Sequence, residues 1–396
     1  MQFQLQREKQ MLGIVKFNKK LQKCNLYSYG FLRIFQGIFG TVFLFELFPS
    51  SDPMPPADET FWIEELGKCH RHIRDRVLQA LHHGDAADLT AIVHHAHDDV
   101  IFGIDRVAEA AMLEYLEQRL AKKAAFVVIA EGIEEPGGRV FPQDRDPKEV
   151  PYRLIIDPID GTRPLMYDKR SGWILTGVAE NKGPTTGLHD VFFAMQTEIP
   201  VQKQCFADML WAFKQGDRAY ALREHLATGN KKEYAPASSS VTTLDQGFAC
   251  FVNFFHGSKE LISRIDEAVA HRLFGPVQPG RTWSFEDQYM STGGQLYELA
   301  TGRDRFIADL RALIERSRKL KGEAMGLCCH TYDLCTFLIA EKAGCIITDE
   351  TGAPLSAPLD TQTAVSWIGY ANHELHKSIQ PILQEVLQSM GLLPSL

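Results

Sequence analysis

The sequence lacks several features that mark common protein classes. Its eight cysteines are scattered without the paired spacing of a disulfide framework, so we expect reduced, mostly buried thiols. The net charge of -8, with no basic cluster near the motifs below, argues against a nucleic-acid surface. No internal repeat or low-complexity tract is visible. A hydrophobic fraction of 45% is ordinary for a globular protein, and 396 residues suffice for one large or two medium domains.

Histidine is present in number but without the spacing of a zinc site. Seven of the fourteen histidines lie between His70 and His97. Clustered histidines can bind zinc or another transition metal. This segment has neither an HExxH pattern nor paired cysteines, and it falls on expected helices. We therefore expect solvent-facing or capping histidines.

The first fifty-odd residues differ in composition from the rest. Four lysines between residues 16 and 23 precede an apolar stretch over residues 30–49, an order typical of a signal or anchor segment. Arg33 and Glu46 interrupt that stretch, which is costly in a membrane span, and no small-x-small cleavage site follows. We expect residues 1–53 to be an over-extended translation start or a disordered tail outside the fold. A membrane anchor is the alternative.

From Phe61 onward the apolar spacing becomes regular. The expected helices are residues 61–83, 85–97, 103–122, 259–273, 306–320 and 334–343. The expected strands are residues 126–131, 152–156, 173–181, 190–195 and 247–254. Past residue 235 the pattern changes to strand–helix alternation. We therefore expect an N-terminal α+β subdomain over residues 54–235, carrying the metal and phosphate site, and a C-terminal α/β subdomain over residues 236–396.

The most informative stretch is Asp157-Pro158-Ile159-Asp160-Gly161-Thr162. It follows an apolar run, residues 152–156, that is typical of a short buried strand. Two carboxylates three residues apart at a strand end can bind one cluster of hard cations. Gly161 and Thr162 free the backbone to turn into a helix, whose first N–H groups suit a phosphate. Metal-binding carboxylates beside a phosphate cradle indicate metal-assisted hydrolysis of a phosphate ester.

This hexapeptide resembles the signature of the inositol monophosphatase-like sugar phosphatases, and other segments resemble that family in the expected order. They are Asp99–Glu109, Phe126–Glu131, Ala300–Arg303, Tyr332–Asp333 and Ala340–Asp349, the last with Lys342 inserted. The resemblance covers residues 99 to about 369. It implies an α/β (α+β) fold, a layered αβαβα sandwich of the sugar phosphatase type with two subdomains that meet at the metal site. It also implies a homodimer, and the reduced thiols expected above indicate a cytoplasmic protein.

The resemblance implies a Mg²⁺ site built from oxygen atoms, which hard cations prefer. The metal ligands that it implies are Glu131, Asp157, the backbone carbonyl of Ile159, Asp160 and Asp333. Two such cations about 3.5–4 Å apart stabilise the attacking and leaving oxygens of a displacement. The chain departs from the family's Gly-Glu-Glu, with Ala130-Glu131-Gly132 followed by Glu134-Glu135. Glu131 is favoured because it ends the strand, and Glu134 is the alternative.

The catalytic residues implied by the resemblance are Glu131, Asp105 and Thr162. Asp105 and Thr162 resemble a water-activating pair, in which the carboxylate accepts a proton from the hydroxyl. The alternative for Asp105 is a helix N-terminal acid stabilised by the helix dipole. Asp99 belongs to the outer metal shell in this interpretation. The substrate-binding residues are Asp160, Gly161, Thr162 and Asp333.

The substrate class follows from the resemblance as a small phosphorylated polyol, sugar or nucleotide, with inositol monophosphate first. Arg163 stands where that branch has a small polar residue, and arginine can bind a second phosphate or make a structural ion pair. The chain is also longer than usual over residues 303–330. Fructose 1,6-bisphosphate, a phosphoadenosine nucleotide, and a catalytically inactive binding relative all stay open. We expect no nucleic-acid partner and no membrane.

Overall fold

The computed structural model describes residues 59–83, 92–95, 100–133, 135, 137–323 and 326–394. The chain divides into two compact units, residues 1–52 and 53–396, and all described residues belong to the second. The predicted extension, Asp99 and Glu134 lie outside the described residues. Within the described part of the chain, no helix is both long and apolar enough to cross a membrane.

The larger of two main sheets has eight strands in the order β10-β9-β8-β7-β6-β5-β3-β4. The strands are β3 (Phe126–Ala130), β4 (Arg139–Phe141), β5 (Tyr152–Asp160), β6 (Gly172–Glu180), β7 (Val191–Ile199), β8 (Phe206–Phe213), β9 (Ala219–His225) and β10 (Lys231–Tyr234). β5 pairs in parallel with β3 and antiparallel with β6, and all its residues are buried. The continuous apolar run of β5 reflects burial on both faces.

The smaller sheet has four strands in the order β11-β12-β14-β13. The strands are β11 (Phe248–Phe251), β12 (Asp304–Asp309), β13 (Ile346–Thr348) and β14 (Trp367–Tyr370). Only the β11–β12 pair is parallel. Strands β1 (Ile92–His95) and β2 (Val100–Phe102) form a separate two-stranded sheet, which is not paired with a strand of either main sheet.

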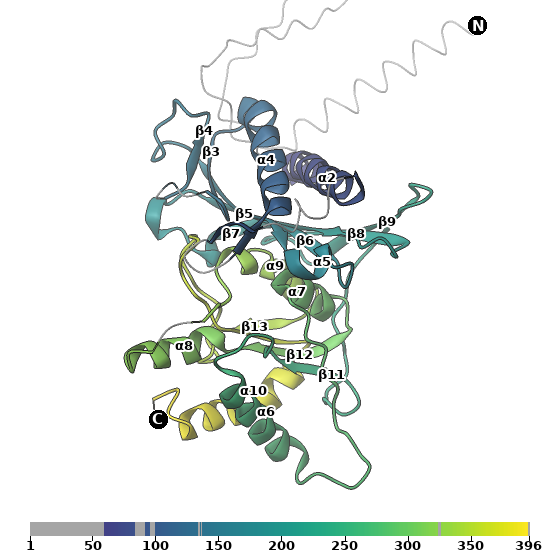
Figure 1. The fold of residues 1–396 in the computed structure, drawn as a ribbon, viewed down its shortest axis with the longest axis vertical. Helices are drawn as coiled ribbons and strands as arrows, with labels where there is room; N and C mark the ends of the chain where they lie inside the picture. The colour runs from purple at the N-terminus through teal and green to yellow at the C-terminus, as the bar shows by residue number, and fades with distance from the viewer. Residues whose placement is uncertain are drawn as a thin grey trace, which may run out of the picture. The chain divides into compact units, whose positions relative to one another are not determined.

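Helices cover both main sheets and fill the space between them (Figure 1). They are α2 (Glu59–His83), α4 (Gly103–Gln118), α5 (Thr162–Met166), α6 (Lys259–Phe274), α7 (Thr292–Ala300), α8 (Arg311–Leu320), α9 (Phe337–Lys342) and α10 (His373–Ser389). The 3-10 turns are η1 (Leu120–Lys122), η2 (Gly183–Thr185), η3 (Leu188–Asp190) and η4 (Tyr332–Leu334). α2 and α4 pack on one face of the large sheet, and α7 and α9 lie between the sheets.

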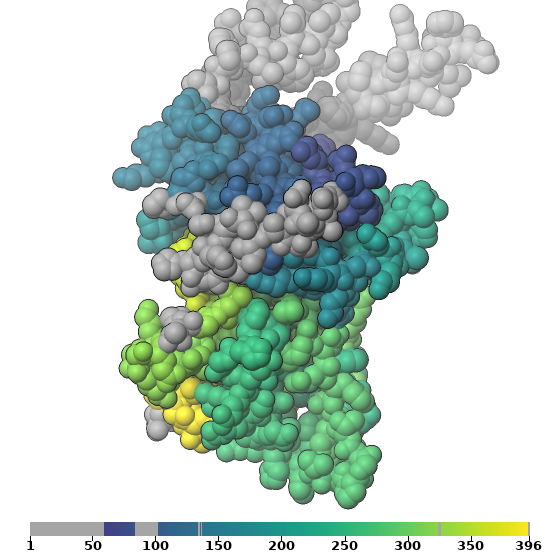
Figure 2. All heavy atoms as spheres, viewed as in Figure 1, coloured from purple at the N-terminus to yellow at the C-terminus, as the bar shows by residue number. Residues whose placement is uncertain are grey.

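Three hydrophobic cores separate these layers. Leu154 and Ile156 of β5 pack with α2 and α4, whereas Ile155 points the other way and packs with α7 and α9. A third core lies between the small sheet and α6 and α10. The order is thus helix, sheet, helix, sheet, helix, which confirms the predicted αβαβα sandwich. Figure 2 shows the early described residues in blue at one end and the green and yellow C-terminal residues at the other.

Some predicted elements were wrong. Residues 92–95 form strand β1, which pairs with β2, so the helix predicted over residues 85–97 is contradicted there. The antiparallel pairing with β2, which follows only a few residues later in the chain, determines this structure, because a strand depends on its cross-strand partner as well as on its own pattern. The helix predicted over residues 306–320 begins only at Arg311, because residues 304–309 complete the small sheet as β12. Likewise the strand predicted over residues 247–254 ends at Phe251.

Candidate active site

An irregularity at the end of β5 places two carboxylates on the same side of the strand. In a regular strand, side chains three residues apart point to opposite faces. The pairing of β5 with β6 shifts register between Asp157 and Asp160, where Pro158 has no N–H to donate to the ladder. Both carboxylates consequently line one pocket. The hexapeptide therefore determines this placement in two ways: it supplies the two acids, and it interrupts the strand between them.

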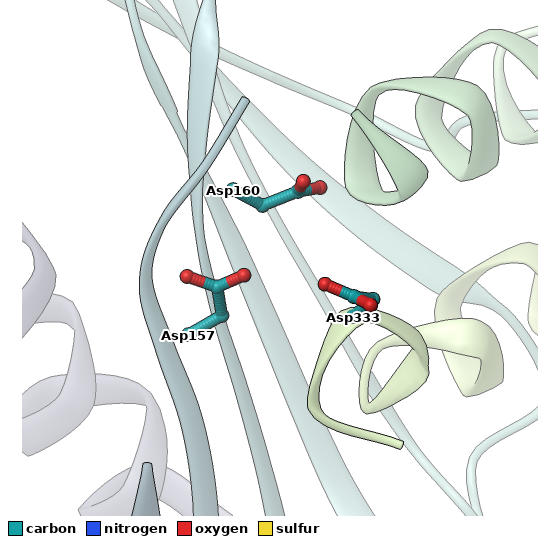
Figure 3. A group of neighbouring side chains, drawn as sticks. All are labelled: Asp157, Asp160 and Asp333. Carbon is teal, nitrogen blue, oxygen red and sulfur yellow. The ribbon is translucent and has the colours of Figure 1, made fainter. Parts of the chain in front are cut away.

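A third carboxylate, that of Asp333, reaches the same place from η4, just before α9. One oxygen from each of Asp157, Asp160 and Asp333 lies within 4.8 Å of the other two. Figure 3 shows the three carboxylates pointing into one space, two from β5 and one from the short turn opposite. Three carboxylates at this separation form an oxygen donor set suited to hard cations such as Mg²⁺.

Backbone and hydroxyl donors hold each of these carboxylates in position. The Ser291 hydroxyl and the Gly293 N–H donate to Oδ2 of Asp160 at 2.8 and 2.5 Å. The Ile159 N–H donates to Asp157 Oδ1 at 3.0 Å. The His330 N–H donates to Asp333 Oδ2 at 2.6 Å. These donors therefore hold the acids in place before any cation arrives.

Burial and mutual repulsion make these acids costly to ionise without a cation. Burial, followed by the charges of Glu131, Asp160 and Asp333, raises the pKa of Asp157 well above its ordinary value. Burial also raises the pKa of Asp160 to about 6, against the opposing hydrogen bonds from Gly293 and Ser291. Negative charge gathered in a buried site needs a counter-charge. The residues present thus fit a bound divalent cation.

Thr162 and Asp105 form the hydrogen bond that the sequence predicts. Thr162 Oγ1 lies 2.7 Å from Asp105 Oδ1 and 3.1 Å from the Ile159 carbonyl oxygen. A hydroxyl has one proton, and the shorter contact directs it to Asp105. Asp105 Oδ2 also accepts the Phe102 N–H at 2.8 Å at the start of α4. Asp105 is therefore both the predicted partner of Thr162 and the helix N-terminal acid of the alternative interpretation.

Gly161 makes the turn from β5 into α5 with φ = 85°, in the left-handed region that favours glycine. A Cβ at this position would lie 3.0 Å from the Cβ of Ser291. The helix that follows is only 5 residues long, so any phosphate cradle here rests on local N–H groups rather than on a helix dipole. Pro164 in that turn has no N–H to contribute.

Glu131 lies directly after β3 and lines the pocket with the three aspartates, although it is outside their closest group. Glu135 instead pairs with Arg139, at 2.6 Å. Glu134 lies outside the described residues. The pocket thus brings together the predicted catalytic, metal and substrate-binding residues other than Asp99: Asp105, Glu131, Asp157, Ile159, Asp160, Gly161, Thr162 and Asp333.

One buried cation in this pocket is not among the residues that the sequence predicts. Arg311 lines it and is 6% exposed. Its Nε and Nη2 donate to the carboxylate of Asp309, with the shortest contact at 2.6 Å. The guanidinium also lies 4.9 Å from the ring centre of Phe254 and 5.3 Å from that of Phe255. The sequence signal for this cation was the charged pair Asp309 and Arg311, two residues apart after an apolar strand.

Arg163, which the sequence singled out, also lines the pocket, 5.1 Å from the ring centre of Phe102. The histidine prediction fails at His70. That side chain is 1% exposed and its two ring nitrogens lie 2.9 and 2.8 Å from the hydroxyls of Thr197 and Thr176. Burial lowers the pKa of His70 to about 3, so it is a neutral core residue. Among the described cysteines only Cys205 is exposed, and none is in a disulfide.

Comparison with solved structures identifies the fold. A protein described as an inositol monophosphatase–fructose 1,6-bisphosphatase matches with a TM-score of 0.54 at 17% identity, covering 82% of this chain and 99% of its own. The fructose-1,6-bisphosphatase of Leishmania major in its holo form gives 0.57 at 14% identity, covering 84% and 95%. The chain has the fold of the inositol monophosphatase and fructose-1,6-bisphosphatase superfamily.

A Thermotoga maritima inositol monophosphatase also has this fold, with a TM-score of 0.52, 15% identity, and coverage of 83% of this chain and all of its own. No protein-family model and no curated protein matches the sequence. The chain thus combines the fold of this superfamily with an acidic pocket. Its reaction and substrate are proposed below from its own residues.

Proposed function

We propose that the chain is a magnesium-dependent phosphatase that hydrolyses a small phosphate monoester with water. One observation carries the proposal. The buried carboxylates of Asp157, Asp160 and Asp333 share a pocket with the hydrogen-bonded pair Thr162 and Asp105. Magnesium, when bound, supplies positive charge that neutralises phosphate oxygens and favours ionisation of water. Glu131, Asp157, Asp160, Asp333 and the Ile159 carbonyl are the proposed ligands.

The protein's own residues would manage the proton and the phosphate. Thr162 Oγ1 accepts the proton of the attacking water as its own proton passes to Asp105 Oδ1, 2.7 Å away. The water oxygen, having lost one proton, bonds to phosphorus as the ester P–O bond breaks. Asp105 holds that proton until it passes to solvent at product release, and the leaving oxygen takes up a proton from solvent to depart as a hydroxyl. The backbone N–H groups that follow Gly161 face the phosphate, and Asp333 faces the leaving hydroxyl from the opposite wall of the pocket.

The division of the chain into subdomains near residue 235 belongs to the same proposal. The large sheet ends at Tyr234 and the first strand of the small sheet begins at Phe248. Asp333 lies on the far side of that division from Asp157 and Asp160, which supports a site formed where the subdomains meet. A cytoplasmic homodimer is part of this proposal by similarity with the superfamily.

Inositol monophosphate is the first substrate to test, because the hexapeptide most resembles that branch. A bisphosphorylated sugar or nucleotide is the second candidate, and Arg311 favours it. Its Nε and Nη2 are bonded to Asp309, and one Nη1 donor reaches the Leu327 carbonyl at 3.3 Å. A guanidinium has five N–H donors, so donors on the Nη1–Nη2 edge stay available for a second phosphate.

Phosphate release from a matched panel decides between these candidates. The panel contains inositol 1-phosphate, fructose 6-phosphate, fructose 1,6-bisphosphate and 3′-phosphoadenosine 5′-phosphate, each with saturating Mg²⁺. Highest kcat/KM with inositol 1-phosphate supports the monoester assignment. Preference for a bisphosphate that is lost in Arg311→Gln supports the alternative. If folded protein that binds Mg²⁺ releases no phosphate from any of them, the activity proposal fails and a binding role takes its place.

A further inference from the structure

A second pocket, of ≈ 420 Å³, lies outside the metal site and shares none of its predicted residues. Its walls come from the segment before β6, the ends of β7 and α7, and strands β8 and β9. Four cationic side chains line it: Lys169, Arg170, Arg223 and Arg303. Three acids also line it: Glu198, Asp208 and Glu298.

The two deepest acids are saturated by the protein. Asp208 is 2% exposed and accepts from Arg223 Nε and Nη2 at 2.8 and 2.6 Å. It also accepts the hydroxyls of Tyr234 and Tyr297, both at 2.7 Å. Four donors occupy its two oxygens, so Asp208 has little capacity to bind a further group.

Glu198 is saturated in the same way. It is 7% exposed, and it accepts the Ser171 hydroxyl and the Gln204 amide at 2.7 Å and the Asp208 N–H at 3.0 Å. The acids at the base of the pocket therefore serve to position the surrounding donors. They do not form a cation site.

The cations, in contrast, are more exposed than Glu198 and Asp208. The side chains of Arg170, Arg223 and Arg303 are 35%, 39% and 48% exposed. Each guanidinium has five N–H donors, of which the protein engages only some. Lys169 is exposed, and its ammonium has no hydrogen-bond or ion-pair partner within the described ranges. Glu298, the third acid, lies 3.2 Å from Arg303 and 3.7 Å from Arg170, so each acid of the lining has a partner and four cations stand against three acids.

All three guanidiniums of the pocket lie over aromatic rings, that of Arg223 at 5.1 Å from the ring centre of Tyr234. Arg170 lies 4.4 Å from the ring centre of Tyr289, and Arg303 lies 4.6 Å from that of Tyr297. Tyr289 is itself fixed, because its hydroxyl donates to the Ser171 carbonyl at 2.7 Å and accepts from Trp173 Nε1 at 2.9 Å. Arginines held in place lose less conformational freedom when they bind an anion.

We propose that this pocket is a second ligand site, which binds a small polyanion carrying phosphate groups, such as a phosphorylated metabolite. Phosphate suits the site because planar guanidinium groups bind its oxygens in pairs and an ammonium adds a point charge. The volume of ≈ 420 Å³ accommodates a ligand larger than a single phosphate ion. The proposal goes beyond the hydrolytic activity proposed above and does not depend on it.

The second pocket connects to the metal site through one short segment of chain. Asp287 pairs with Arg170 at the pocket, and Tyr289 lines it. Ser291 and Gly293, at the other end of the segment, donate to Asp160. A ligand that binds Arg170 therefore acts on the same segment that positions Asp160, a proposed metal ligand.

Titration calorimetry with inorganic pyrophosphate tests the proposal on metal-free protein exchanged into chelator-free buffer. Metal-free protein is used so that no cation draws pyrophosphate into the first pocket, where Arg163 and Arg311 also lie, and variants of each pocket assign the binding to its site. We expect one bound pyrophosphate per chain, and a loss of at least about tenfold in affinity in Lys169→Ala/Arg303→Ala, since hydrogen bonds to charged groups contribute about 1.5–3 kcal/mol. Citrate in the same titration separates phosphate from carboxylate, and binding as tight as that of pyrophosphate overturns the assignment to phosphate.

Two control variants make the result specific. Arg272→Ala removes an exposed arginine of α6 that pairs with Glu385, away from both pockets, and should bind pyrophosphate like the wild type. Asp333→Asn changes the metal pocket alone and should also retain binding. No detectable binding, equal loss in Arg272→Ala, or loss only in Asp333→Asn overturns the proposal.

Cys205 provides a readout that needs no variant. Its thiol is exposed and lines the second pocket, whereas the other described cysteines are buried. We expect saturating pyrophosphate to slow alkylation of Cys205 by iodoacetamide at least fivefold, measured by mass spectrometry of the Cys205 peptide. An unchanged rate at concentrations that saturate the calorimetric binding places the anion elsewhere and overturns the proposal.

Discussion

The hydroxyl of Thr162 donates to Asp105 at 2.7 Å, which joins the start of α5 to the first turn of α4. If this pair activates water, Thr162→Ala should lower kcat by about 10²–10⁴-fold, the usual contribution of a positioned acid–base group. Magnesium affinity should change little, because the hydroxyl is not a proposed ligand. Steady-state kinetics and a Mg²⁺ titration together measure both effects.

Thr162→Ser is the matched control, because it keeps the hydroxyl and removes only a methyl group. We expect it to retain most of the activity. If the alanine and serine variants lose the same amount, the hydrogen bond to Asp105 has only a structural role.

Asp157→Asn should separate metal binding from folding. Burial and neighbouring charge raise the pKa of Asp157, so its ionised form is disfavoured in the metal-free protein. A neutral amide of the same shape removes that cost and can still accept the Ile159 N–H. The metal-free variant should thus be at least as stable as the wild type in urea denaturation.

Urea denaturation in the presence of Mg²⁺ should show the opposite order of stability, with the wild type more stable than Asp157→Asn. A ligand at a concentration 100 times its Kd stabilises the wild type by about 2.7 kcal/mol. Asp157→Asn should lose most of this gain and most of the turnover. Full stabilisation by Mg²⁺ in the variant removes Asp157 from the ligand set.

Gly161→Ala should disturb both the turn and Asp160. Alanine at φ = 85° costs about 1–2 kcal/mol, and its Cβ would lie 3.0 Å from that of Ser291, which donates to Asp160. Gly183→Ala supplies the control, because Gly183 has φ = 65° but no atom within 4 Å of the added Cβ. Both variants should lose stability, and only Gly161→Ala should weaken Mg²⁺ binding. Equal Mg²⁺ affinity in the two contradicts the role of the turn.

Asp304 should make stability depend on pH. Burial, followed by the charges of Glu298 and Asp287, raises its pKa to about 7, against about 3.9 in an unfolded chain. Between these values the folded state binds more protons, so stability falls as pH rises. This contribution is fully present below pH 4 and lost as pH rises through 7. Urea denaturation of the wild type and Asp304→Asn measures this effect. From pH 4 to pH 7 the wild type should lose stability relative to Asp304→Asn, and a stability difference that does not change with pH would refute the role of Asp304.

The sequence was sufficient for much of the site because its signals are local. Asp157, Asp160 and Thr162 lie within six residues, and their chemistry follows from the end of a buried strand. Placing Asp333 beside them required the family resemblance, since 173 residues separate it from Asp160. The same family order predicted the five-layered arrangement before any packing was known.

The remaining features depend on tertiary contacts that no local pattern reports. Ile92 pairs with Phe102 in a sheet instead of continuing a helix. His70 lies between two threonine hydroxyls more than one hundred residues away. Arg311 enters the pocket because Asp309, at the end of β12, holds its guanidinium. Only the partners of His70 are distant in sequence, whereas Phe102 and Asp309 lie near Ile92 and Arg311 in the chain and act through the pairing and the pocket that the fold creates.

The most direct measurement of the central claim is phosphate release from inositol 1-phosphate and fructose 1,6-bisphosphate by wild type and Asp333→Asn across a Mg²⁺ titration. We predict release by the wild type that requires Mg²⁺ and saturates with it, and a loss of at least about 10²-fold in Asp333→Asn, comparable to removing one group that stabilises a transition state. Release that is independent of Mg²⁺, or undiminished in Asp333→Asn, would contradict the account.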